Sequence, residues 1–212
     1  MRRTFWVFAV ITALAVVIYT QSVSLQRYGE RRSRAAARSS KDIVVGVCWP
    51  FSVNKDDMAD GVTLAQDEIN ARGGASGRRF QLIVRDSRLS SAVAKQITLE
   101  FASNPEVTAV LGYYDDDLAV EASPVYEESS LLHIIIGGNN SFMTSHGFRY
   151  IVHTVLTNDK IGKKLAHLVM RQNYRKCAII WEEDGYGEDL AYHFQTALDE
   201  DTLVFSRSYA RV

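Results

Sequence analysis

Residues 58–86 change from a helical pattern to a strand pattern. The first part carries apolar residues every three or four positions, the spacing of one helix face. These residues are Met58, Val62, Ala65 and Ile69. The run 80–84, FQLIV, is mostly apolar and is typical of a strand covered on both faces. Gly73 and Gly74 lie between the two parts and supply the backbone freedom that ends a helix. The pattern predicts a helix, a glycine exit and a buried strand.

The same alternation continues along the chain. Short apolar runs predict strands, and the segments between them carry apolar residues at helical spacing. The predicted strands are 43–48 (IVVGVC), 80–84 (FQLIV), 108–111 (TAVL), 131–136 (LLHIII), 178–181 (AIIW) and 203–208 (LVFSRS). Strands that alternate with helices are typical of parallel sheets, because each parallel connection needs a crossover. We therefore predict an α/β fold with a doubly wound parallel sheet.

The N-terminus carries an uncharged apolar run, TFWVFAVITALAVVIY, preceded by Arg2 and Arg3. Its length lies at the border between a signal-peptide core and the roughly 17 to 25 residues that span a bilayer. Residues 1–22 are therefore predicted to be either a cleaved signal peptide or an inner-membrane anchor at 4–20, in the membrane at least during export. The two arginines favour the cytoplasmic side, so the rest of the chain is expected on the periplasmic or extracellular side.

Composition indicates an ordinary globular protein, with 47% hydrophobic residues, 23% charged residues and a formal net charge of -1. No overall basic field is present that would attract a polyanion, so no nucleic-acid partner is expected. The local exception is 27–41, RYGERRSRAAARSSK, where basic and small residues cluster without apolar periodicity. Residues 23–42 are predicted to form a basic, solvated linker.

Catalytic and metal-binding motifs are missing from the sequence. The histidines show no HxxxH or HExxH spacing, and neither a Gly-x-Ser-x-Gly elbow nor a P-loop is present. Cys48 and Cys177 have no base at a recognisable spacing and are expected to be buried free thiols. We expect no enzyme activity, no cofactor and no metal site.

Three motifs follow one another along the chain: DEIN-x-RGG at 67–74, FR…T…ND…G at 148–162 and D-x-YG at 184–187. In this order and spacing, and within a similarity that runs from Ile43 to about Asp199, the chain resembles the leucine/isoleucine/valine-binding-protein family of type I periplasmic solute-binding proteins. The resemblance implies two α/β lobes joined by crossover strands that close on a small solute. It assigns 43–155 to lobe one and 156–212 to a partial lobe two, because family members are roughly twice as long.

Ligands of open α/β sheets bind beyond the carboxyl ends of the strands, where backbone N–H groups of the next helix are free. In amino-acid binders of the family, small hydroxyl residues in these loops hold the α-carboxylate. Here Asp116 falls where the resemblance implies a Ser, and Asn139 where it implies a Thr. A carboxylate facing a carboxylate in a partly desolvated cleft is unfavourable. The charge pattern therefore better suits a cationic or hydroxyl-rich solute.

The candidate ligand-binding residues are Trp49, Tyr114, Asp116, Gly137, Asn139 and Tyr186. Several of them have a structural alternative. Asp115, Asp116 and Asp117 open a predicted helix and either cap it, contact a ligand or join a metal site. Gly137 and Gly138 form either a flexible turn or a close backbone approach, and Trp49 either lines the cleft mouth or packs at a hinge.

Three functions remain open from the sequence. The first is extracytoplasmic binding of an amino acid or related polar solute, with an ABC permease or other membrane partner. The second is a membrane-anchored sensing or interaction module built on the same lobe. The third is a truncated remnant without binding activity.

Overall fold

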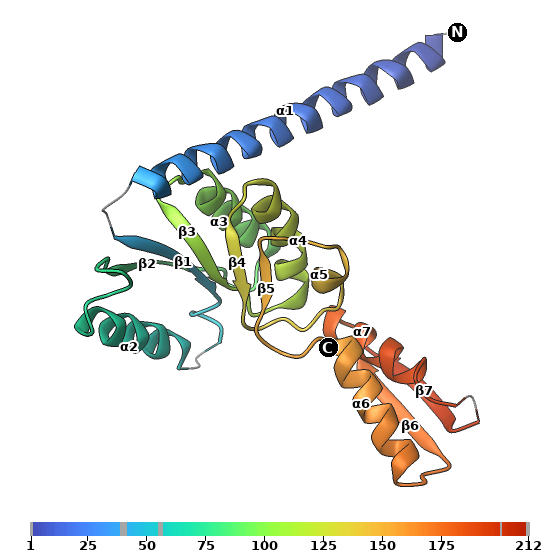
Figure 1. The fold of residues 1–212 in the computed structure, drawn as a ribbon. Helices are drawn as coiled ribbons and strands as arrows, with labels where there is room; N and C mark the ends of the chain where they lie inside the picture. The colour runs from blue at the N-terminus through green and yellow to red at the C-terminus, as the bar shows by residue number, and fades with distance from the viewer. Residues whose placement is uncertain (1, 39–41, 55–56, 200, 211–212) are drawn as a thin grey trace.

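A five-stranded parallel sheet forms the larger body of the computed structural model, which describes residues 2–38, 42–54, 57–199 and 201–210 (Figure 1). The strand order is β2-β1-β3-β4-β5, and every pairing is parallel. The strands are β1 (Ile43–Trp49), β2 (Phe80–Asp86), β3 (Val107–Gly112), β4 (Leu132–Ile135) and β5 (Ile151–His153). The predicted doubly wound parallel α/β sheet is confirmed.

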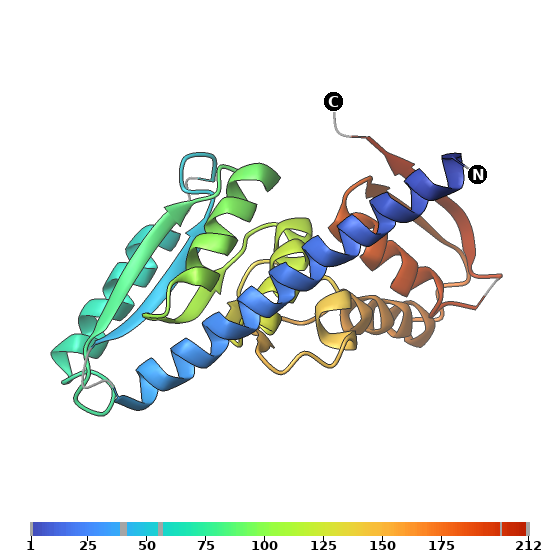
Figure 2. The same ribbon diagram turned by 90° about the horizontal axis from the view of Figure 1, so that it is seen from above.

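Helices cover both faces of this sheet. The α2 helix (Met58–Ala71) lies on one side, and α3 (Ser91–Ser103) and α4 (Asp116–Glu128) lie on the other (Figures 1 and 2). The main core fills the space between the sheet and the α3/α4 layer, with the fully buried side chains of Phe101, Val110 and Tyr126 at its centre. A short helix, α5 (Phe142–Ser145), follows β4.

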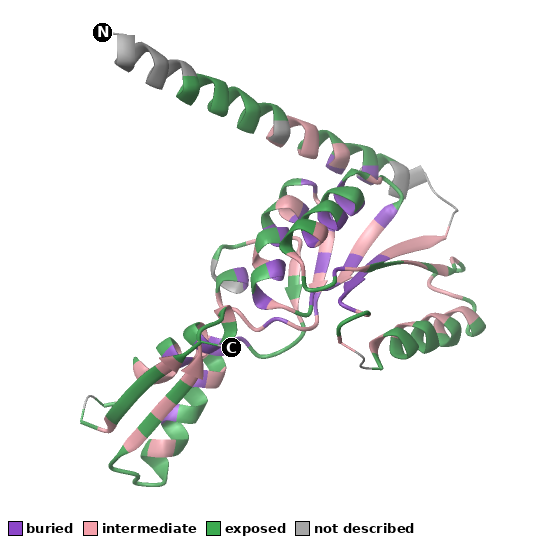
Figure 3. Ribbon diagram, turned by 180° about the vertical axis from the view of Figure 1, so that it is seen from behind, coloured by how far each residue is buried: buried purple, intermediate pink, exposed green. Residues whose placement is uncertain are grey.

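A smaller body follows β5. It contains α6 (Asn158–Arg171), β6 (Cys177–Glu182), α7 (Gly185–Gln195) and β7 (Leu203–Tyr209), and its two strands pair in parallel. The α6 and α7 helices pack against each other, and a Cβ added to Gly162 would lie 2.7 Å from the backbone nitrogen of Phe194. Buried side chains are concentrated in the larger body, as Figure 3 shows. The larger body, residues 43–153, falls within the predicted lobe one and takes that name, and the smaller body, residues 157–209, falls within the predicted lobe two and takes that one.

The N-terminal helix α1 (Arg2–Arg38) extends from one end of lobe one (Figure 1). Apolar side chains between Val10 and Tyr19 are exposed. Among the described residues, no helix contains a stretch that is both long enough and apolar enough to cross a membrane.

The basic segment differs from the solvated linker that the sequence predicts. Residues 23–38 continue α1, which packs against α3, α4 and the start of β3. Arg32 is buried, and its guanidinium donates to the carbonyl oxygens of Ala102 at 2.9 Å and Val107 at 2.8 Å. Ala102 lies in the last turn of α3, and the guanidinium also donates to the carbonyl oxygen of Ser129, the C-cap residue of α4, at 2.5 Å. A cation at the carboxyl ends of two helices meets unpaired carbonyl groups and the negative end of each helix dipole, which favours docking over solvation. Residues 39–41 of the predicted linker lie outside the described residues.

The cysteines also depart in part from the expectation. Both are free thiols, but only Cys48 is buried, whereas Cys177 is partly exposed at the start of β6. Cys177 lies in a two-stranded sheet, where less of each strand is covered than in the five-stranded sheet of lobe one.

Candidate functional site

The candidate residues of lobe one lie where β1, β3 and β4 end, at one edge of the sheet. Trp49 is the last residue of β1, and Tyr114 follows β3. Their rings meet edge to face, with centroids 5.2 Å apart. Trp49 is buried, as the predicted packed aromatic would be, whereas the side chain of Tyr114 is 46% exposed. Tyr114 therefore presents an aromatic surface to solvent beside the strand ends, and the buried Trp49 packs against it.

Gly137 and Gly138 bring the loop after β4 against the loop after β3. A Cβ on Gly137 would lie 2.4 Å from the carbonyl oxygen of Tyr113, and a Cβ on Gly138 would lie 2.4 Å from Asp116 Oδ1. Real Cβ atoms do not approach other atoms this closely, so the backbone contact excludes a side chain at Gly137, and a side chain at Gly138 would require the Asp116 carboxylate to move. Of the two alternatives for these glycines, the structure has the close approach, and it is made to the neighbouring loop.

The three aspartates at the start of α4 have different roles. Asp115 is the N-cap, and its Oδ1 accepts hydrogen bonds from the backbone N–H groups of Asp117 and Leu118 at 3.0 and 3.2 Å. The predicted capping is therefore made by Asp115. Asp116 instead reaches across to the loop after β4, where its Oδ1 accepts from the N–H of Asn140 at 3.0 Å.

Asp116 is buried, and burial raises the pKa of its carboxyl group. The N–H groups of Asn140 and Asn139 oppose this shift, while the carboxylates of Asp115 and Asp189 add to it. Its second oxygen, Oδ2, is buried without a hydrogen-bond partner. Buried carboxylate oxygens are normally paired, so this unpaired acceptor marks Asp116 as an unusual group in the fold.

The loop after β4 also joins the two lobes. The carbonyl oxygen of Asn139 accepts from the N–H of Asn158 at 2.8 Å, and Ser141 Oγ accepts from the N–H of Asp159 at 2.9 Å. Ser141 N–H in turn donates to Asp189 Oδ2 of α7 at 3.0 Å. Asn139, predicted as a ligand contact, thus uses its backbone carbonyl at the lobe junction.

Lobe two contributes the start of α7 to the junction. Asp184 caps this helix, accepting from the N–H of Gly187 at 2.6 Å. A Cβ on Gly185 would lie 2.3 Å from Asp117 Oδ1, so the first turn of α7 abuts the first turn of α4. Tyr186 extends from that turn with a side chain that is 45% exposed. The structure therefore gathers the lobe-one candidates at one edge and places Tyr186 on the opposite side of the junction.

A buried polar cluster lies beneath this edge and was not predicted from the sequence. The hydroxyl of Tyr113 lies 2.6 Å from that of Thr98 and 2.9 Å from that of Tyr126. The ring of His133 packs edge to face on both tyrosines, and its Nε2 lies 3.1 Å from the carbonyl oxygen of Gly112. Burial lowers the pKa of His133 to about 3, so the imidazole is neutral at pH 7.

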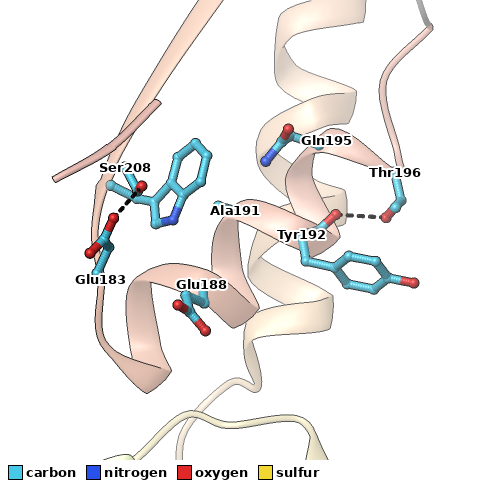
Figure 4. A pocket seen from close by; sticks show the side chains of 8 residues that line it. Glu183, Glu188, Ala191, Tyr192, Gln195, Thr196 and Ser208 are labelled. Carbon is cyan, nitrogen blue, oxygen red and sulfur yellow. Dashed lines mark hydrogen bonds between the residues drawn. The ribbon is translucent and has the colours of Figure 1, made fainter. Parts of the chain in front are cut away.

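Lobe two has a pocket of its own, of about 440 Å³, between α7 and one face of the β6–β7 sheet (Figure 4). Glu183 and Ser208 line its sheet side and are joined by a hydrogen bond of 2.6 Å. Trp181 and Tyr192 supply aromatic surface. None of these residues was predicted as a site residue, because alternation along a strand indicates which side chains share a face but not what covers that face.

Comparison with known proteins places this geometry in a family. Leu/Ile/Val-binding protein homolog 7 of Brucella melitensis is 30% identical over 189 residues, which are 82% of this chain and 47% of that protein. The leucine-specific-binding protein of Salmonella typhimurium is 28% identical over 172 residues, or 78% of this chain and 45% of that one. The chain therefore spans about half the length of these curated relatives.

A solved structure gives the same result. An ABC transporter substrate-binding protein from Desulfitobacterium hafniense, in complex with Leu, superposes with a TM-score of 0.73 at 27% identity, over 81% of this chain and 52% of that chain. A family model described as the receptor family ligand binding region matches residues 57–210. The chain therefore belongs to that receptor ligand-binding family and has the type I periplasmic-binding-protein fold.

Proposed function

We propose that this protein binds a small polar solute, an amino acid or a related compound, at the junction between its two lobes. The similarity to proteins named for binding leucine, isoleucine and valine carries the proposal. The position of the junction supports it, because loops from three parallel strand ends and the first turn of α7 meet there. Strand carboxyl ends and helix N-termini are where open α/β sheets bind ligands.

We further propose that this binding serves ABC-type import on the extracytoplasmic side of a membrane. The relatives include a substrate-binding protein of an ABC transporter. Arg2, Arg3 and the apolar run that follows support export, with the segment either cleaved or kept as an anchor. A permease or other membrane protein would be the partner.

The anchored sensing or interaction module is the second candidate. It is favoured by the docking of residues 23–38 on lobe one, since Arg32 holds this part of α1 against α3 and α4. Because this part of α1 is fixed to lobe one, a movement of lobe one would also move residues 2–22 of the same helix and any partner bound to them. Mass spectrometry of the mature N-terminus tests the module, because the module requires residues 4–20 to be retained and their cleavage would overturn it.

Thermal unfolding of the full chain with a solute panel tests binding. The panel contains amino acids, amides and diamines at millimolar concentrations. A solute present at about 100 times its Kd stabilises the folded state by roughly 2.7 kcal/mol, which is a measurable rise in Tm. We expect at least one member of the panel to raise Tm with a saturating dose dependence.

Two exposed tyrosines provide a matched comparison. Tyr186→Ala, at the junction, should reduce the ligand-induced rise in Tm while changing the ligand-free Tm little, because its side chain is half exposed. Tyr174→Ala, which removes an exposed tyrosine beyond the far end of α6, should leave both values unchanged. A panel without any active member, or equal losses in the two variants, would refute binding at the junction.

A further inference from the structure

A groove of about 440 Å³ lies between α3 and α4 of lobe one, and all of its lining residues belong to these two helices. We call it the α3/α4 groove. Its floor consists of side chains that are at most 6% exposed. They are Ala94 and Thr98 of α3 and Leu118 and Ala122 of α4. Because two of the four are alanines, the groove is a hollow that has room for side chains of a second surface.

The walls of the α3/α4 groove carry one positive, one negative and two apolar side chains. Lys95 and Leu99 line the α3 wall, and Glu121 and Val125 line the α4 wall at the same one-turn spacing. The side chain of Leu99 is 46% exposed. Neither Lys95 nor Glu121 belongs to an ion pair among the described residues. One surface therefore presents a hollow, a projecting leucine and two opposite charges.

Hydrogen bonds give the α3/α4 groove a fixed shape. At one end, Ser91 Oγ of α3 donates to Glu121 Oε2 of α4 at 2.8 Å, which joins the two walls. The hydroxyl of Thr98, the polar side chain of the floor, donates to the carbonyl oxygen of Ala94 at 2.8 Å and lies 2.6 Å from the hydroxyl of Tyr113. No polar group of the floor is left for a small polar ligand, so the groove has the properties of a packing surface.

The α3 and α4 helices run in the same direction. They connect β2 to β3 and β3 to β4, and these strands are all parallel, so both helices return antiparallel to them. A two-fold axis parallel to the groove would therefore place α3 of one copy on α4 of the other. In that arrangement Lys95 faces Glu121 of the second copy, and one turn further Leu99 faces Val125 of the second copy.

We propose that the α3/α4 groove is a homodimer interface, in which a second copy of this chain packs its own α3 and α4 on the groove about a two-fold axis parallel to the helices. Opposite charges on the two walls make the surface its own complement, because the axis exchanges the walls and thereby the signs. Each contact is made twice, which gives two ion pairs between Lys95 and Glu121 and two apolar contacts between Leu99 and Val125.

The position of α1 agrees with this arrangement. α1 packs on the carboxyl ends of α3 and α4, where Arg32 donates to the carbonyl oxygens of Ala102 and Ser129. An axis parallel to α3 and α4 preserves the direction of both helices, so α1 of both copies lies at the same end of the dimer. The exposed apolar runs between Val10 and Tyr19 then extend from that one end, as attachment of both copies to a single membrane requires.

Sedimentation velocity of the full chain in density-matched detergent tests the proposal. Small interfaces have micromolar Kd values, so we expect a reversible dimer to form between about 1 and about 100 µM. Leu99→Asp should weaken the dimer at least tenfold, because it places a charge against the apolar Val125 of the second copy. Leu64→Asp is the matched control, since Leu64 is an exposed leucine on α2 at the other face of the sheet, and it should leave the Kd unchanged.

Reversal of the charges tests which walls meet. Lys95→Glu and Glu121→Lys should each weaken the dimer at least tenfold, because like charges would then face each other across the axis. The double variant carries opposite charges again and should recover most of the lost affinity. The Tm of each variant, measured alongside, shows whether that variant is folded.

Three results would contradict the proposal. A natural protein that stays monomeric over this concentration range would overturn it. A dimer that Leu99→Asp and Leu64→Asp affect equally would also overturn it, because the copies would then associate elsewhere, for example through the apolar run of α1. A double charge variant as weak as either single variant would show that Lys95 and Glu121 do not meet across the axis, and the proposed arrangement would fail.

Discussion

At the scale of single residues, Arg32 is expected to stabilise the fold through its bonds to backbone carbonyls. Arg32→Ala would leave the carbonyl oxygens of Ala102 and Val107 buried without their charged donor. Hydrogen bonds to charged groups contribute about 1.5–3 kcal/mol each, partly shared within such a cluster, so we expect a loss of about 2–4 kcal/mol in the free energy of unfolding.

Urea denaturation measures that loss, and Arg34 supplies the control. Arg34 lies on the same helix, is exposed, and pairs with Glu30 at 3.5 Å. Exposed helix pairs of this kind contribute a few tenths of a kcal/mol, so Arg34→Ala should change stability by less than about 0.5 kcal/mol. Similar losses in both variants would mean that the docking of α1 does not depend on the buried guanidinium.

A second residue, His133, should make stability fall in acid. Burial lowers its pKa in the folded protein to about 3, whereas in the unfolded chain it titrates near its ordinary value of 6.5. Between these values the unfolded state holds the extra proton, so protonation favours unfolding. Stability contributed by the neutral imidazole is full above about pH 6.5 and declines by up to about 1.4 kcal/mol per pH unit as the pH falls toward 3.

The measurement compares pH profiles rather than absolute stabilities, because replacing a buried His is itself destabilising. The free energy of unfolding of the His133→Gln variant, followed from pH 7 to pH 4.5, should decline less steeply than that of the natural protein. His167→Gln, at an exposed position on α6, should keep the natural slope. A slope unchanged by His133→Gln would show that other groups control acid unfolding.

At the scale of secondary-structure elements, two glycines give opposite predictions. Gly46 lies in β1 where α3 packs, and an added Cβ would lie 2.9 Å from the ring of Phe101. Gly61 lies in α2, and an added Cβ there meets nothing within 4 Å. Gly46→Ala should lower the free energy of unfolding by about 1–3 kcal/mol through overpacking. Gly61→Ala should raise it by up to about 1 kcal/mol through helix propensity.

Thermal and urea unfolding of the two variants measures whether the free energy of unfolding falls in Gly46→Ala and rises in Gly61→Ala. The added methyl group is the same in each case, so opposite signs would report its surroundings, which are the ring of Phe101 at Gly46 and open space on a helix at Gly61. If both variants are stabilised, the contact between β1 and α3 is looser than these distances indicate.

The elements also show what the sequence could predict. The strands found at 43–49, 80–86 and 107–112 begin or end within a residue or two of the predicted apolar runs, because burial on both faces requires continuous apolar sequence. β5 has only three residues and was not predicted as a strand, since so short a segment shows no periodicity of hydrophobic residues. The docked part of α1 was also missed, because a single buried Arg32 looks like any other basic residue in the sequence.

The candidate site was predictable in position but not in detail. Strand ends identify where the loops of a parallel sheet converge, and Trp49, Tyr114 and Asp116 do lie at that edge. The bond from Asn140 to Asp116 and the pairing of Tyr113 with Tyr126 join residues of different segments, 24 and 13 positions apart along the chain. Such contacts depend on loop conformation, which hydrophobic periodicity does not encode.

At the scale of the whole molecule, the two lobes differ in how completely their sheets are covered. In lobe one, β1 has strand neighbours on both sides and helices over both faces. In lobe two, β7 is the only partner of β6 among the described strands. One sheet face there leaves apolar side chains exposed, with Ile180 at 67% and Phe205 at 46%. Less burial per strand means a smaller free energy for local opening.

Hydrogen exchange followed by mass spectrometry should therefore show earlier exchange in peptides from β6 and β7 than in peptides from β1 and β3. Gly162→Ala should widen that difference, because the added Cβ would meet the backbone of Phe194 and separate α6 from α7. Gly61→Ala, on lobe one, should leave exchange in lobe two unchanged. If strands of both lobes exchange together, and Gly162→Ala accelerates all of them equally, the protein unfolds as one cooperative unit and the exposed face of lobe two does not weaken it locally.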